Sequence, residues 1–509
     1  MVSTLSRVLA AFFAAFSINA HSEPSFEPID PTKMVLKNTR ALDDNTEYQL
    51  YTHPVGEPGS NKYVRPDAPP NAPFKTALIV PRDPPDDASL RVSVYFDGFT
   101  TNAKRFPTPD FGSPGYAVIK THHGHYPNLK AYASKSGVKP YDWGGFAKGD
   151  SNGWRFGSGF VKLSEIMPSA IDWDAGLRLE GKSWGGTTAI LQSLLIKGPA
   201  VQSAVTIVNS NIPNTLFVRK DTTPGDNIDQ NGMYYMDPSA VQYAWDDPTN
   251  VITGDIIANA DKLKGVYYAV FGNSQDQVTK FDLEFFTLFC EAKKIACMGA
   301  WRGGDHNFPD TGLVESRDRS SSVGLPAFMS SPYGPSGPFS GPDSDSRLDK
   351  ILPVFTNSTA NFFSSTPGKP GFLRGHYNLG LEWNSSTQPT PTANKLTLPI
   401  RYRKHTGFGT GSRYAWGEER GPDKNKANWI PDQPDSATFD LTLRRTGDFS
   451  LPLGKEVCYT LPAQGKNPEQ SGSATVTVAD EITITALTLD TSTTYSDFEL
   501  NAKTSSCME

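Results

Sequence analysis

A serine between two glycines carries the clearest chemical signal in the chain. Gly181, Ser183 and Gly185 form a Gly-x-Ser-x-Gly pentapeptide, in which a sharp turn leaves no room for larger side chains two residues either side of the serine. Residues 175–180 alternate apolar and polar side chains like a short strand, and residues 187–195 carry apolar side chains at helical spacing. A serine at the turn between strand and helix is typical of a nucleophile. The alternative is a glycine-rich turn whose serine merely faces solvent.

A carboxylate and a histidine follow at places that would suit this serine. A serine hydroxyl is a weak nucleophile until an imidazole takes its proton, and a carboxylate then fixes the tautomer of that imidazole. Asp276 follows a strand predicted over 265–272, and His306 follows one predicted over 295–301. Asp305 is the rival acid, but a residue adjacent to the histidine can rarely turn back onto its ring. We therefore expect Asp276 to be the acid.

Two backbone N–H groups are candidates for binding the oxyanion that such an attack creates. The strand predicted over 91–96 runs into Asp97-Gly98-Phe99, where a glycine lets N–H groups point into a site. The second candidate is the N–H group of Trp184, the residue after the serine. Phe99 and Trp184 are therefore the predicted oxyanion residues.

Three further residues are candidates for lining a substrate pocket. His123 is one of three histidines within four positions, a pattern that could bind zinc or copper. No carboxylate or thiolate stands at matching spacing nearby, so we expect a pocket-lining loop and no metal site. Tyr235 and Trp245 belong to an aromatic-rich insertion over 211–262, which either caps the pocket or forms a small core of its own.

The order of predicted elements indicates the fold class. Strands alternating with helices predict a doubly wound, mostly parallel α/β sheet, whose sites form beyond the carboxyl ends of its strands. Ser183, Asp276 and His306 all follow such ends. Strands are predicted at 76–80, 91–96, 115–120, 175–180, 201–208, 265–272 and 295–301, and helices at 160–170, 187–195 and 282–293.

About half of the chain resembles the α/β-hydrolase superfamily, and within it secreted serine esterases and prolyl-oligopeptidase-like hydrolases. The Ser, Asp, His order is that of the fold. Residues 271–278 are similar to the acid-bearing loop of these enzymes, and residues 304–308 are similar to their histidine loop. Residues 95–99 stand where the family has its oxyanion strand, with Asp97 in place of the usual histidine. The resemblance implies a cofactor-free serine hydrolase.

Composition divides the 509-residue chain into segments. A positive charge at Arg7 followed by an apolar run too short to cross a bilayer predicts a secretory signal, hence a secreted or periplasmic protein. Near the other end, strands without helices predict an all-β, sandwich-like domain that folds independently and supplies no catalytic group. It would either tether the enzyme to a large substrate or cover an apolar flank. The segments are 1–20 (signal peptide), 21–72 (irregular arm), 73–320 (catalytic domain), 321–394 (Pro/Gly/Ser-rich linker) and 395–509 (sandwich-like domain).

Four cysteines, an even number in an exported chain, predict two disulfides. Neighbours along the sequence would pair, Cys290 with Cys297 and Cys458 with Cys507. Free buried thiols are the alternative.

Charge and composition limit the classes of partner that the chain could bind. A net charge of −6 without a basic block argues against nucleic acid, and no stretch after the signal is long and apolar enough to span a membrane. We predict a secreted serine hydrolase that cleaves a carboxylic ester, possibly polymeric, through an acyl-enzyme, with its oligomeric state left open. The alternatives are an exported serine peptidase of the prolyl-oligopeptidase type and a catalytically silent binding protein of hydrolase fold.

Overall fold

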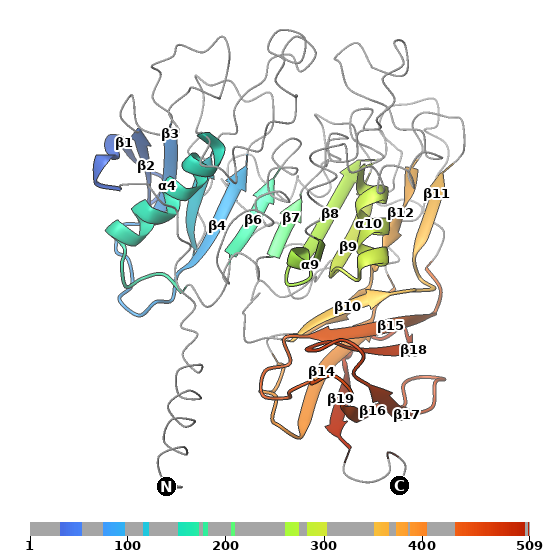
Figure 1. Cartoon of the computed structure of the whole chain (residues 1–509). Coiled ribbons are helices and arrows are strands. Elements are labelled where there is room, and N and C mark those ends of the chain that lie inside the picture. The colour runs from blue at the N-terminus through green and yellow to red at the C-terminus, as the bar shows by residue number, and fades with distance from the viewer. Residues whose placement is uncertain are drawn as a thin grey trace, which may run out of the picture.

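A computed structural model describes residues 31–52, 75–96, 116–121, 151–172, 177–181, 205–208, 260–273, 282–302, 351–365, 373–384, 387–404, 433–503 and 507. These residues form an eleven-stranded sheet, a three-stranded sheet and a five-stranded sheet. The two small sheets lie together below the large one (Figure 1).

The large sheet has a parallel centre with antiparallel strands at both ends. β5, β4, β6, β7, β8 and β9 are parallel neighbours, as predicted for most of the sheet. Buried runs such as Ala77–Val80 and Ala117–Ile119 suit strands that are covered on both faces. In spatial order the strands are β1 (Val35–Ala41), β2 (Thr46–Thr52), β3 (Lys75–Pro81), β5 (Tyr116–Thr121), β4 (Arg91–Phe96), β6 (Leu177–Gly181), β7 (Val205–Val208), β8 (Tyr267–Asn273), β9 (Cys297–Arg302), β12 (Leu373–Tyr377) and β11 (Phe362–Ser365).

Helix α4 (Ser151–Ile166) packs against β3 and β5, and buries Phe160 and Leu163 in their core. Its close approach requires glycine at 159, because a Cβ there would collide with the side chain of Ile119. The helix begins earlier than predicted. α9 (Ala260–Leu263) precedes β8, and α10 (Asp282–Lys293), which has the predicted bounds, packs against β8 and β9. The doubly wound arrangement of helices on both faces stays a prediction.

The segment predicted as an irregular arm, 21–72, instead extends the sheet. Its described part contains the short 3-10 helix η1 (Pro31–Lys33) and the hairpin β1–β2, which pairs with β3. The Asp43 carboxylate closes the hairpin by accepting hydrogen bonds from the backbone N–H groups of Asn45 (2.8 Å) and Thr46 (2.7 Å). The sequence alone could not predict this hairpin, because Tyr48 and Tyr51 are buried by residues distant in the chain. Tyr48 lies in a cluster with Ile79 and Val118, and Tyr51 lies in the core that contains Phe160.

The two small sheets pack face to face as a β-sandwich, called here the C-terminal sandwich. All its strand pairs are antiparallel, and Phe439 and Ile484 of one sheet share a core with Leu398 and Phe498 of the other. In the three-stranded sheet the spatial order is β10 (Leu352–Thr356), β15 (Ser436–Arg444) and β18 (Ile482–Asp490). In the five-stranded sheet it is β13 (Leu381–Trp383), β14 (Lys395–Tyr402), β19 (Ser496–Ala502), β16 (Glu456–Leu461) and β17 (Gln470–Thr475).

The segment predicted as a linker, 321–394, contains four strands in its described part. β10 and β13 belong to the sandwich, whereas β11 and β12 extend the large sheet, with Tyr377 of β12 opposite Gly299 of β9. Met298 of the large sheet lies in the same core as the sandwich strands. The core of the sandwich therefore includes strands that precede residue 395, and independent folding of 395–509 stays a prediction.

Candidate active site

The carboxyl edge of the parallel strands contains a point where the strand order reverses. After β4 the chain adds β5 on one side, then returns to add β6 on the other. Ligands of open α/β sheets bind at such a switch point. The register places Phe96, the last residue of β4, opposite both Thr121 of β5 and Gly181 of β6. Three adjacent strands therefore end at one level.

Four predicted residues follow these aligned ends within three positions. His123 comes two residues after Thr121, Phe99 three after Phe96, and Ser183 two after Gly181, with Trp184 next in the chain. Two residues below the ends, Val94 pairs with both Ile119 and Leu179, and all three are fully buried. The edge is therefore built on rigid, close-packed strands rather than on loops.

The same register continues across the sheet to the acid and the base. Gly181 is opposite Val208, Val208 is opposite Val270, and Val270 is opposite Gly299. β8 and β9 extend further, to the paired residues Asn273 and Arg302. Asp276 and His306 follow these ends after three and four residues. The arrows of β4, β6, β7 and β8 point to one edge of the sheet, on the side away from the C-terminal sandwich (Figure 1).

The predicted site residues themselves lie outside the described residues. They are Ser183, Asp276, His306, Trp184, Phe99, His123, Tyr235 and Trp245. The structure brings together the ends of the strands that precede the first six; Tyr235 and Trp245 belong to the insertion, which is described only from residue 260. The signal segment 1–20 is outside the described range as well.

One predicted disulfide is present and the other is wrong. Cys458 and Cys507 are bridged, as expected. Cys290 of α10 and Cys297 of β9 are free, buried thiols. Burial and a hydrogen bond with Cys297 raise the pKa of Cys290, which keeps it in the unreactive thiol form. The two cysteines are therefore close enough for a hydrogen bond but form no disulfide.

Sequence reasoning also missed a group of residues at the opposite edge of the sheet. Arg444 and Arg445 of the sandwich donate hydrogen bonds to the backbone carbonyls of Lys264 and Gly265, just before β8. No sequence pattern could have found them, because their partners are carbonyl groups 180 residues earlier in the chain.

Comparisons with known proteins give distant similarities to hydrolases. No protein-family model and no curated protein matches the sequence. An S-formylglutathione hydrolase from Staphylococcus aureus has a TM-score of 0.30 and 13% identity, covering 57% of this chain and 98% of that chain. The S-formylglutathione hydrolase from Agrobacterium tumefaciens gives 0.33 and 12%, covering 57% and 99%. Acetyl xylan esterase 1 from Thermoanaerobacterium sp. gives 0.27 and 14%, covering 55% and 83%.

In the part of the chain that the structure describes, every helix is too short or too polar to cross a membrane.

Proposed function

We propose that this chain is an exported serine hydrolase of the α/β-hydrolase fold that cleaves a carboxylic ester through an acyl-enzyme. Ser183 is the nucleophile, His306 the general base and Asp276 the acid. The observation that carries the proposal is the common edge: the strands preceding all three residues are parallel, in register, and end at the same edge of the sheet, where the strand order reverses between β5 and β6. The Cys458–Cys507 disulfide supports export, because disulfides persist in oxidising compartments.

Chain reach supports convergence of the three residues. Neighbouring strands are about 4.8 Å apart, so β8 lies about 10 Å from β6, and β9 about 15 Å. An extended chain spans at most about 3.3–3.6 Å per residue. The three residues after Asn273 therefore reach up to about 10 Å, and the four after Arg302 up to about 13–14 Å. With the reach of the two residues that lead to Ser183, these lengths suffice for a meeting above β7.

The reaction follows from these roles. As the Ser183 hydroxyl oxygen attacks the ester carbonyl carbon, His306 takes its proton, and the N–H groups of Trp184 and Phe99 stabilise the oxyanion. His306 then gives the proton to the alcohol oxygen, whose bond to the carbonyl carbon breaks. Water, activated by the same imidazole, releases the acid from the acyl-enzyme. Asp276 fixes the tautomer and stabilises the imidazolium. His123, Tyr235 and Trp245 would line the pocket.

Labelling and hydrolysis by the mature chain test the proposal. A fluorophosphonate should label the wild-type protein but not Ser183→Ala, and only the wild type should hydrolyse p-nitrophenyl butyrate. Faster cleavage of an aminoacyl-proline amide would instead favour a peptidase. No labelling and no hydrolysis would leave a silent binding protein.

A further inference from the structure

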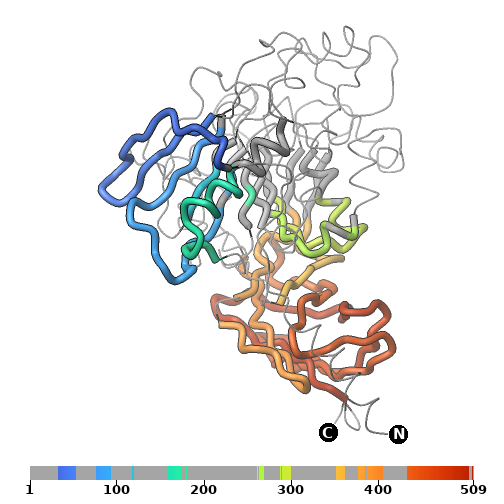
Figure 2. The backbone as a smooth tube through the Cα atoms, turned by 60° about the vertical axis from the view of Figure 1, so that its left-hand side comes forward, coloured from blue at the N-terminus to red at the C-terminus, as the bar shows by residue number. Residues whose placement is uncertain are grey.

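The C-terminal sandwich packs against the large sheet at the amino-terminal ends of β8 and β9. The ring of Tyr267, the first residue of β8, meets that of Trp383 edge to face, with centroids 5.0 Å apart. Ala296 and Met298 at the start of β9 are buried in the same core. Figure 2 shows the orange and red sandwich strands beside this yellow-green region and apart from the blue hairpin β1–β2.

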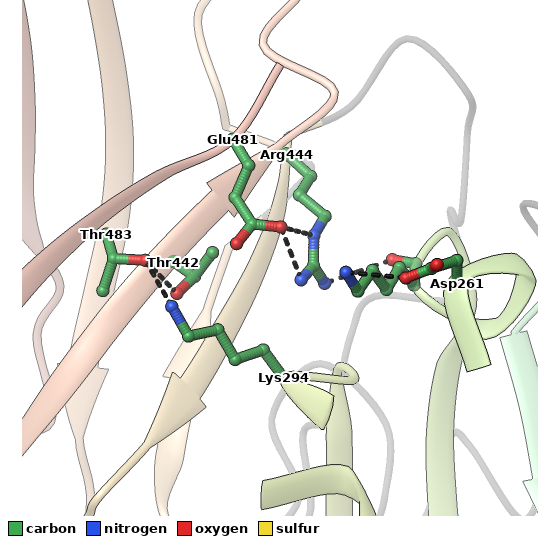
Figure 3. Close-up of polar contacts among 7 residues, drawn as sticks. Asp261, Lys294, Thr442, Arg444, Glu481 and Thr483 are labelled. Carbon is green, nitrogen blue, oxygen red and sulfur yellow. Dashed lines mark hydrogen bonds and ion pairs between the residues drawn. The ribbon is translucent and has the colours of Figure 1, made fainter. Parts of the chain in front are cut away.

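Two arginines of the sandwich, the buried Arg444 and the half-buried Arg445, add hydrogen bonds to the chain that enters β8. Arg445 donates a hydrogen bond to the Gly265 carbonyl, and Arg444 donates one to the Lys264 carbonyl at 3.3 Å. Glu481 orients Arg444 by accepting a hydrogen bond from its Nε at 2.8 Å (Figure 3). Burial lowers the pKa of Arg445 to about 10, far above neutral pH, so it remains a charged donor.

Further hydrogen bonds hold α10 and β9. The Glu291 carboxylate of α10 accepts a hydrogen bond from the backbone N–H of Asn357, just after sandwich strand β10, at 2.5 Å. It accepts another at 2.6 Å from the hydroxyl of Tyr377, which lies on β12 of the large sheet and is also 3.4 Å from the Phe355 carbonyl of β10. The Asn378 side-chain amide donates to the Cys297 carbonyl at 3.0 Å, and Lys294 donates to the Thr483 hydroxyl at 3.1 Å (Figure 3). Together with the arginines, these contacts fall on the α9–β8 junction, α10 and β9.

We infer that the sandwich positions the acid and the base of the proposed triad by fixing β8 and β9 at their far ends. The inference rests on the proposed function, in which β8 leads to Asp276 and β9 to His306. A strand is a stiff connection, so a shift at Gly265 is carried along β8, which is about 20 Å long, to its carboxyl end. A misplacement of about 1 Å can cost about 100-fold in rate. Arg445 of the sandwich is therefore a positioning residue, and so is Tyr377 of β12, whose hydroxyl lies between Glu291 of α10 and the Phe355 carbonyl of sandwich strand β10.

The test replaces each positioning residue without removing its apolar bulk. Arg445→Met removes the hydrogen-bond donor to the Gly265 carbonyl, and Arg445→Lys restores a donor. Tyr377→Phe removes the hydroxyl that donates a hydrogen bond to Glu291. Val457→Ala is the control, because Val457 is fully buried on β16 at the far side of the sandwich. For each, we measure the unfolding midpoint, kcat and KM for p-nitrophenyl butyrate at a temperature well below that midpoint, and amide hydrogen exchange.

Arg445→Met and Tyr377→Phe should each lower kcat by about tenfold with little change in KM, and Arg445→Lys should recover much of the loss. Because Asp276 stabilises the imidazolium, loosening it should lower the pKa of His306 and move the acid limb of the kcat/KM profile to lower pH. Amides of 267–273 and 297–302 should exchange faster. Val457→Ala should lower the midpoint and leave kcat and the pH profile unchanged.

Unchanged kcat in both positioning variants would overturn the inference, as would an equal fall in the Val457→Ala control. Failure of the proposed function looks different. Wild-type protein would then neither hydrolyse the ester nor react with a fluorophosphonate. Amide hydrogen exchange of Arg445→Met and Tyr377→Phe would then test by itself whether the sandwich fixes the two strands. Faster exchange confined to β8 and β9 supports this, and unchanged exchange overturns it.

Discussion

Replacing Glu481 by alanine should destabilise the protein strongly, because it leaves a buried charge without its partner. The side chains of Arg444 and Glu481 are each 9% exposed and lie 2.8 Å apart. Burial lowers the pKa of Arg444, and Glu481 opposes that effect. Breaking a buried pair by removing one partner costs about 3–5 kcal/mol, so Glu481→Ala should lower the free energy of unfolding by this amount.

An exposed ion pair of the same sandwich provides the control. The Lys395 and Glu499 side chains are 50% and 30% exposed, and pairs of this kind contribute about 0–1 kcal/mol. Glu499→Ala should therefore cost less than about 1 kcal/mol. Urea unfolding followed by fluorescence and circular dichroism, extrapolated linearly to water, measures both changes.

The double replacement Arg444→Met with Glu481→Leu separates two contributions to the loss of stability: the lost attraction between the two charges, and the cost of leaving Arg444 buried without a partner. Because it leaves no uncompensated ion, it should cost less than Glu481→Ala alone. The reasoning is refuted if Glu481→Ala costs no more than Glu499→Ala, or if the Glu481→Leu and Arg444→Met effects simply add in the double mutant.

Four further outcomes are expected. Ser183→Ala should lower kcat for p-nitrophenyl butyrate by about 10⁴-fold or more with an unchanged melting temperature; retention of a hundredth of the rate removes Ser183 from its role. Asp276→Asn should lower kcat/KM more than Asp305→Asn, and the reverse order would exchange the acids. Gly159→Ala should destabilise the protein by about 1–3 kcal/mol in urea unfolding, because its Cβ meets Ile119; a gain from helix propensity would contradict this. A chain ending at residue 350 should aggregate in light scattering, since it exposes Tyr267 and Met298; a soluble, active fragment would contradict the shared core.

Local pattern predicted the elements whose burial follows from their own residues. β4 and α10 have the predicted bounds, because an apolar run before a glycine and helical spacing of apolar side chains are local signals. The β1–β2 hairpin and β10–β13 were missed, although Leu352–Thr356 is a fully buried run. Their strands are stabilised by distant partners, such as β9 for β12, and turn-forming residues around them resembled a linker.

For the candidate site, the sequence supplied residue types and order, and the structure adds the register that aligns the preceding strand ends. The pairing of Phe96 with Gly181 could not be read from either strand alone, because register depends on both partners. The unlinked thiols of Cys290 and Cys297 show the same limit, since spacing along the chain does not fix bond formation.

The place of the C-terminal sandwich favours the covering role over the tether role. It buries Tyr267 and Met298 at the amino-terminal ends of β8 and β9, and Arg445 bonds to the chain entering β8. A tether would need only a flexible connection, whereas this contact has a continuous apolar core with buried polar bonds at its border. The sandwich therefore covers an apolar flank of the large sheet. Because it does so at the edge opposite the candidate site, it leaves the carboxyl edge to the residues of the segment predicted to be catalytic.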